Sequence, residues 1–257
     1  MPTSKETVDS YNEHAKEWAE ASREGRRQGS ELLERPAMHA MLPDLKGKEV
    51  LLLGCGSGEE VKEIARRGAL RVVGTDISEG LIAEAKKAYP GHDFRVMDME
   101  KIDFPKASFD VVYASLALHY LPSWGEVLKR VRYVLRPGGT FLFSVNHPVY
   151  WSAESSKDDE GRHRLLGYTK RKDDSVVHYG DYLGTVKLEG VLQNTLKVTY
   201  WSRPFGEMLR DIREAGFEIL DMQEPRATET AKKTEHAFWE GHQKIPLFVI
   251  FHIAPRQ

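Results

Sequence analysis

Residues 49–58, with the sequence EVLLLGCGSG, constrain the fold more than any other segment of this 257-residue chain. Four apolar residues, Val50 to Leu53, run directly into a turn in which every second residue is glycine. An unbroken apolar run of this kind is typical of a parallel strand that is buried on both faces. Glycines after such a strand permit a tight turn and a close approach of ligand to backbone. The segment therefore predicts a strand–turn–helix unit that binds a nucleotide.

The residues after this turn indicate which nucleotide it would bind. A dinucleotide fingerprint requires glycine at position 59, where this chain has Glu59 followed by Glu60. Carboxylates are stabilising at the start of a helix, but they would repel a pyrophosphate placed there. The pattern favours an adenosine compound without a phosphate chain. A strand-to-helix turn that binds no ligand would contain the same glycines.

Polar residues also end the next three predicted strands. Asp76 follows an apolar run and lies 22 residues after Gly54, where doubly wound folds place the acid that binds a ribose. Ser78 is a good N-cap for the following helix, so Asp76 is not needed as a cap. Asp98 and Ser115 follow the third and fourth apolar runs. Because parallel strands end at one edge of a sheet, we expect these residues to lie together there.

These motifs occur in the order and spacing of a known family. With GCGSG, the acid Asp76, the pair Asp98-Met99, and the segments SFDVVYASLALHYL and LRPGG, the chain resembles the class I S-adenosylmethionine-dependent methyltransferases. The resemblance is to the small-molecule branch (type 11/25-like) and covers residues 11–145 and, more loosely, 203–253. It implies an α/β fold with a Rossmann-like, seven-stranded, mostly parallel sheet flanked by helices. It also implies S-adenosyl-L-methionine as cofactor and in-line transfer of its methyl group to a small-molecule acceptor.

The resemblance also implies roles for individual residues. Asp76 would accept hydrogen bonds from the ribose, and Asp98 would meet the adenine amino group. Ser115 or Ala114 would approach the methionine end. Relatives commonly carry an acid at the position of Leu52, so a backbone carbonyl or Glu59 would have to orient the cofactor's amino group here. The predicted cofactor-binding residues are Tyr11, Gly54, Cys55, Gly56, Gly58, Asp76, Ile77, Asp98, Met99 and Ser115.

Two histidines are candidates for a catalytic base. His119 follows the fourth predicted strand and His147 the fifth. A poorly acidic hydroxyl acceptor would need such a base, whereas a thiol or a carboxylate would not. Either histidine could instead be a structural hydrogen-bonding residue. The predicted acceptor pocket consists of His119, Tyr120, Tyr150 and Trp201, and no metal site is predicted.

We expect one domain, residues 1–257, with an insertion. Cap helices are expected within 7–42 and the core within 48–149 and 204–257. Residues 150–203 begin polar and then alternate between polar and apolar, which predicts antiparallel strands after the fifth strand of the sheet. An insertion there would stand over the ligand edge as a substrate lid, although a solvated hairpin would show the same pattern.

Net charge, cysteine content and the lack of long apolar segments argue against several other functions and locations. The formal net charge of −2 does not favour binding to nucleic acid. The N-terminus lacks the apolar core of a signal peptide. The single cysteine, Cys55, favours a reducing compartment, and no apolar run is long enough to span a membrane. We expect a cytoplasmic monomer or homodimer. The alternatives are a methyltransferase that acts on RNA or protein, a non-catalytic S-adenosylmethionine-binding protein and, less favoured because of Glu59, an NAD-dependent oxidoreductase.

Overall fold

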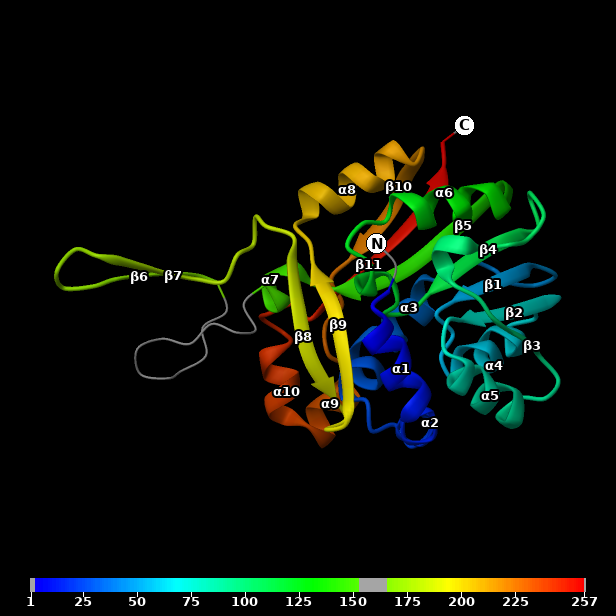
Figure 1. Ribbon diagram of the computed structural model, residues 1–257, viewed down its shortest axis with the longest axis horizontal. Helices are drawn as coiled ribbons and strands as arrows, with labels where there is room; N and C mark the ends of the chain where they lie inside the picture. The colour runs from blue at the N-terminus through cyan, green and yellow to red at the C-terminus, as the bar shows by residue number, and fades with distance from the viewer. Residues whose placement is uncertain (1–2, 153–165, 257) are drawn as a thin grey trace.

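A computed structural model of the chain, described for residues 3–152 and 166–256, contains a seven-stranded sheet (Figure 1). Its strands in chain order are β1 (Glu49–Leu53), β2 (Arg71–Asp76), β3 (Asp93–Val96), β4 (Phe109–Ala114), β5 (Leu135–Asn146), β10 (Phe217–Gln223) and β11 (Phe248–Pro255). Across the sheet the order is β10-β11-β5-β4-β1-β2-β3. Neighbouring strands from β1 to β5 pair in parallel, and β11 pairs antiparallel with both β5 and β10. The predicted Rossmann-like sheet with an antiparallel last strand is confirmed.

Helices cover both faces of this sheet, which explains the continuous apolar run of β1. The covering helices are α3 (Arg35–Met41), α4 (Glu59–Arg66), α5 (Glu79–Ala88), α6 (Gly125–Val134) and α8 (Phe205–Glu214). Leu51 and Leu53 pack in a core cluster with residues of α6 and α8. Leu52, which points to the other face, packs with residues of α3, α4 and α5. Because both faces of β1 are covered, each of its residues after the first is buried.

The N-terminal cap contains a break that the sequence pattern does not predict. The apolar pattern over 7–24 predicts one helix, but the structure has α1 (Lys5–Glu13) and α2 (Ala15–Arg23), separated at His14. The break lets α1 contact β9 (Leu196–Ser202) while α2 contacts α5. Two hydroxyls of α1 attach it to that strand, since Thr7 Oγ1 and Ser10 Oγ accept hydrogen bonds from backbone N–H groups of β9.

The sequence predicts a second cap helix over 31–42 that is interrupted or begins near Pro36, and the structure agrees. A short π-helix, η1 (Ser30–Glu34), leads directly into α3. Pro36 has no N–H to donate to the carbonyl of Leu32, and that carbonyl accepts from the Thr228 N–H instead. The segment 224–243, which has no sequence-based assignment, supplies this contact and forms α9 (Glu229–Thr234) and α10 (His236–Gly241).

The insertion after β5 consists of a short helix and two hairpins. It contains α7 (Pro148–Trp151) and the antiparallel pairs β6 (Gly167–Lys170) with β7 (Val176–Tyr179) and β8 (Val186–Leu192) with β9. The predicted antiparallel insertion is confirmed, and its polar first part, 153–164, lies outside the described residues. The β6–β7 hairpin projects away from the sheet, whereas β8–β9 lies beside α1 (Figure 1). Within residues 3–152 and 166–256, no helix has the length and apolar character needed to cross a bilayer.

Candidate active site

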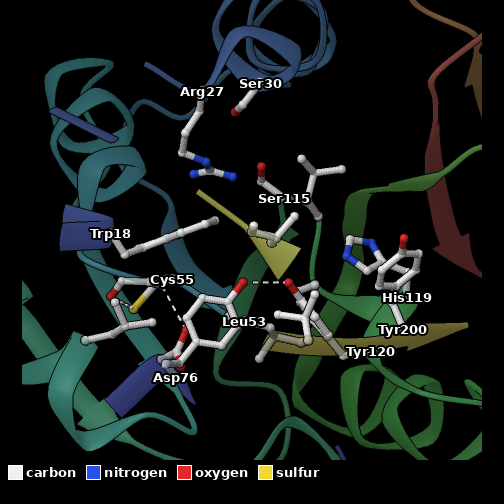
Figure 2. Close-up of a pocket in the computed structure, with 18 of the residues that line it drawn as sticks. Trp18, Arg27, Ser30, Leu53, Cys55, Asp76, Ser115, His119, Tyr120 and Tyr200 are labelled. Carbon is white, nitrogen blue, oxygen red and sulfur yellow. Dashed lines mark hydrogen bonds between the residues drawn. The ribbon is translucent and has the colours of Figure 1, made fainter. Parts of the chain in front are cut away.

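A cavity of about 430 Å³ lies at the C-terminal edge of the parallel strands (Figure 2). The strand ends contribute Gly54, Asp76 and Ser115, and α1 and α2 of the cap contribute Tyr11 and Trp18. The 3-10 turns η2 (Met99–Lys101) and η3 (Leu118–Tyr120), which follow β3 and β4, form further parts of the wall. The cavity is thus enclosed between the sheet edge, the cap and the β8–β9 hairpin.

Most of the residues that the sequence singled out line this cavity. The lining includes Tyr11, Gly54, Cys55, Gly56, Asp76, Ile77, Asp98, Met99, Ser115, His119 and Tyr120. Four predicted site residues are not part of the lining, and these are Gly58, His147, Tyr150 and Trp201. The topology of the parallel sheet therefore brings the predicted cofactor residues to one place, while some of the predicted acceptor residues lie elsewhere.

All three glycines of the turn have positive φ angles. Gly54 and Gly56 have φ angles of +63° and +54°, which side-chain-bearing residues rarely adopt. A Cβ on Gly54 would lie 2.7 Å from the Cβ of Ala117, so this position has no room for a side chain. Gly58, predicted to contact the cofactor, has a φ of +90° and also packs closely, because a Cβ there would lie 2.8 Å from the ring of Phe94.

Asp76 is buried at the end of β2 and joins two parts of the site. Its Oδ2 accepts a hydrogen bond from the Gly56 N–H at 2.9 Å, and its Oδ1 accepts from the Ser78 N–H at 2.9 Å. Ser78 Oγ caps α5 by accepting from the Leu81 N–H, as predicted. Asp76 also has a structural role that the sequence does not indicate, because its carboxylate holds the glycine turn through the Gly56 N–H. Burial raises the pKa of Asp76, and the backbone donors oppose that rise.

His119 lies in the wall opposite the cofactor residues. Its side chain is buried, and its Nδ1 has no hydrogen-bonding partner among the described residues. Burial, helped by the positive charge of Arg27, lowers the pKa of His119 to about 3. The imidazole is therefore neutral near pH 7 and has one nitrogen able to accept a hydrogen bond. Its ring centroid lies 4.6 Å from that of Tyr120 and 6.3 Å from that of Tyr200.

A pair of tyrosines joins the cap to the segment after β4. The hydroxyls of Tyr11 and Tyr120 are 2.6 Å apart, and Tyr11 packs edge-on against Trp18 with ring centroids 5.2 Å apart. Burial raises the pKa of both tyrosines, so both hydroxyls stay protonated near neutral pH. Both tyrosines line the cavity, so their hydrogen bond connects the cap to the sheet edge within the cavity wall.

His147 does not occupy the position of a catalytic base. Its Nε2 lies 2.8 Å from Glu224 Oε1, and its Nδ1 accepts from the Val149 N–H at the start of α7. Only 1% of the residue is exposed, and it does not line the cavity. Both nitrogens serve the structure, so the prediction of a base at His147 is wrong.

At two positions the cavity is lined by the chain neighbour of a residue of the predicted acceptor pocket. Tyr200 and Trp151 line the cavity, whereas their neighbours Trp201 and Tyr150 do not. Successive side chains of a strand point to opposite faces, so Tyr200 shares its face of β9 with the lining residue Val198. The sequence predicts a pocket role for aromatic residues of the insertion that include both Tyr200 and Trp201. The alternation over 196–202 favours Tyr200, because the apolar residues Leu196 and Val198 are in phase with it.

Sequence reasoning did not identify Glu34, a fully buried acid next to the cavity. Its Oε1 accepts from Ser115 Oγ at 2.8 Å and from Ser144 Oγ at 2.5 Å. Ser144 Oγ in turn accepts from the N–H of Leu116, whose φ of +51° is unusual for a residue with a side chain. Burial raises the pKa of Glu34. This network holds the turn after β4, and no local sequence pattern indicates it.

The acid that relatives carry at Leu52 has two possible substitutes in the cavity wall. Glu59, the predicted one, accepts from Ser57 Oγ at 2.9 Å through each of its oxygens and lies 3.6 Å from Arg23. Glu60 lines the cavity as well, but it already pairs with Arg35. A negative charge is thus present on this side of the cavity despite Leu52.

Comparisons with known proteins agree with this geometry. A family model described as a methyltransferase domain matches residues 51–143. An S-adenosylmethionine-dependent methyltransferase of Mesorhizobium loti has a solved structure that is 30% identical, covers 86% of this chain and 96% of its own, and superimposes with a TM-score of 0.67. A solved structure from Listeria monocytogenes is 26% identical, covers 87% of this chain and 97% of its own, and has a TM-score of 0.73. Trans-aconitate 2-methyltransferase of Deinococcus radiodurans is 32% identical over 136 residues, which are 51% of this chain and 47% of that protein.

The fold and the strand-edge cavity are those of a class I methyltransferase. The chain belongs to the S-adenosylmethionine-dependent methyltransferases, with S-adenosyl-L-methionine as its cofactor.

The position of the β6–β7 hairpin leads to a first prediction. Its residues do not line the cavity, and all four residues of β6 are exposed. Replacing residues 169–177 by a two-glycine turn should therefore leave affinity for S-adenosylhomocysteine, measured by calorimetry, within about two-fold of the unmodified protein. Tyr200→Ala is the comparison, because it removes a lining residue and should reduce turnover. A large loss of turnover on shortening the hairpin would place β6–β7 in acceptor binding.

Proposed function

We propose that this protein transfers the methyl group of S-adenosyl-L-methionine to a small-molecule acceptor held between the strand edge and the β8–β9 hairpin. One observation carries the proposal: the acceptor side of the cavity is walled by the aromatic residues Tyr120, Trp151 and Tyr200, which come from three separate segments. Such a wall suits a compact ligand that is shielded from water. The relative that methylates trans-aconitate, as its name states, supports a small acceptor.

The cavity has the features needed to hold the cofactor. Gly54 and Gly56 leave bare backbone for its methionine portion, and Asp76 offers a fixed carboxylate to the ribose hydroxyls. Asp98 and Ile77, which follow the neighbouring strands β3 and β2, suit the adenine end. The bound cofactor supplies a methyl group on a positively charged sulfur, and the protein needs mainly to bind, orient and exclude water.

His119 has the properties of a residue that positions the acceptor and takes its proton. A neutral imidazole in the cavity wall can accept a hydrogen bond from an acceptor hydroxyl through its unprotonated nitrogen. Its low pKa makes it a weak base in the free protein. The hydroxyl proton becomes more acidic as its oxygen bonds to the methyl carbon, and at that stage His119 can receive it.

Two measurements test the proposal. Calorimetry should show that the unmodified protein binds S-adenosylhomocysteine more tightly than NADH. Incubation with S-adenosylmethionine and a low-molecular-weight metabolite extract should then release S-adenosylhomocysteine, followed by mass spectrometry. Tighter binding of NADH would overturn the cofactor assignment. Release that requires an RNA or protein fraction would favour the macromolecular alternative.

A further inference from the structure

Arg27 is a cation in the cavity wall that has no carboxylate partner among the described residues. Its guanidinium makes one hydrogen bond in this part of the chain, a long one of 3.4 Å from Nη1 to Ser22 Oγ. In contrast, Arg35, another arginine of the cavity wall, lies 2.5 Å from the carboxylate of Glu60. Arginine in an enclosed site normally pairs with an anion, so Arg27 has unused capacity to bind one.

The side chain of Trp18 holds Arg27 over the glycine turn. The guanidinium carbon of Arg27 lies 4.2 Å from the ring centroid of Trp18, within the range of a cation–π contact. The indole nitrogen of Trp18 lies 3.7 Å from the position that a Cβ on Gly56 would take. Trp18 therefore contacts Arg27 and also lies next to the glycine turn. Figure 2 shows its guanidinium pointing into the cavity, between Trp18 and Ser115.

The charge of Arg27 also acts on the opposite wall. It lowers the pKa of His119 and opposes the rise in the pKa values of Tyr11 and Tyr120. A positive potential thus reaches from the glycine turn to the acceptor side. A planar guanidinium that is fixed by stacking can donate two parallel hydrogen bonds, and a carboxylate has the matching shape and charge.

We propose that Arg27 is the carboxylate-binding residue of this cavity. The inference rests on the proposed function, which places two sources of a carboxylate near it. One is the amino-acid portion of the cofactor, which would lie along the turn at Gly54 and Gly56. The other is an acidic acceptor on the side of His119.

Two nucleosides, one with and one without the amino-acid carboxylate, test whether Arg27 binds the carboxylate of the cofactor. S-adenosylhomocysteine carries the amino-acid carboxylate, whereas 5′-methylthioadenosine has the same adenosine and sulfur but no carboxylate. Arg27→Met should weaken S-adenosylhomocysteine binding in calorimetry by about ten-fold or more and change 5′-methylthioadenosine binding by less than about two-fold. Arg27→Lys, which retains the charge but not the fork, should fall between the two. Lys16→Met, an exposed charge removal on α2, is the matched control and should leave both affinities unchanged.

A second titration tests whether Arg27 binds the carboxylate of an acidic acceptor. Protein saturated with S-adenosylhomocysteine is titrated with succinate and with citrate as carboxylate probes. If the acceptor carboxylate binds Arg27, these acids should raise the melting temperature of the unmodified protein and not that of Arg27→Met.

Three outcomes are distinguishable. If Arg27→Met selectively weakens S-adenosylhomocysteine binding or abolishes the response to the acids, the proposal is supported and the source of the carboxylate is identified. Unchanged binding of both nucleosides together with an unchanged response to the acids overturns it, as does an equal loss of both nucleosides, which would make Arg27 a structural residue. If the unmodified protein binds neither nucleoside, the proposed function itself fails, independently of Arg27.

Discussion

Asp76→Ala is expected to reduce the affinity for S-adenosylhomocysteine by at least about 100-fold. The carboxylate would lose two charge-assisted hydrogen bonds to the ribose, worth roughly 1.5–3 kcal/mol each. The change would also release the Gly56 N–H, so the glycine turn that receives the rest of the ligand would lose its support. Isothermal calorimetry measures the loss directly.

A conservative variant separates these two contributions. Asp76→Asn keeps one oxygen that can accept from a backbone N–H but removes the negative charge. It should fall between the unmodified protein and Asp76→Ala in affinity, and its melting temperature should also fall, because the amide NH2 would face one of the two backbone N–H donors. Unchanged affinity for S-adenosylhomocysteine in both variants would show that the ribose binds elsewhere.

His119→Ala is expected to lower the methylation rate by about 10²-fold with a hydroxyl acceptor, while cofactor affinity stays within a few-fold. The pH dependence should be informative as well. A histidine with an ordinary pKa would lose activity as the pH falls through 6.5, because its protonated form cannot accept a proton. Since the pKa of His119 is about 3, this loss should be absent between pH 6 and 9 in the free enzyme's kcat/KM.

The control for this experiment is His178→Ala, in the β6–β7 hairpin outside the cavity lining. It should retain the full rate. Equal rates in the unmodified protein and His119→Ala across pH 6 to 9 would leave His119 as a structural residue. A base would then be unnecessary, as for a thiol or carboxylate acceptor.

The fold and the cofactor side of the cavity could be predicted because their signals are local. Val50 to Leu53 and the glycines after them specify a buried strand and its turn through consecutive residues alone. Asp76 and Ser115 then follow from one topological rule, since parallel strands end at a common edge. No long-range contact had to be known for any of these residues.

The acceptor side was decided by contacts between distant segments. Tyr200 rather than Trp201 faces the cavity because β9 is attached to α1, through hydrogen bonds that span more than 180 residues of sequence. His147 lies outside the cavity lining, and its Nε2 pairs with Glu224, which is 77 residues away in the sequence. Glu34 reaches Ser144 across 110 residues.

The physical reason for this difference lies in what a sequence pattern encodes. Periodicity and glycine placement state which face of a segment is apolar and where the backbone must turn. They do not state which charged or aromatic side chain will find a partner, because that depends on the packing of elements far apart in the chain. The sequence by itself therefore determined the sheet, the glycine turn and the position of Asp76 at the strand edge of this methyltransferase. The tertiary structure alone decided which histidine, which tyrosine of β9 and which arginines line the cavity.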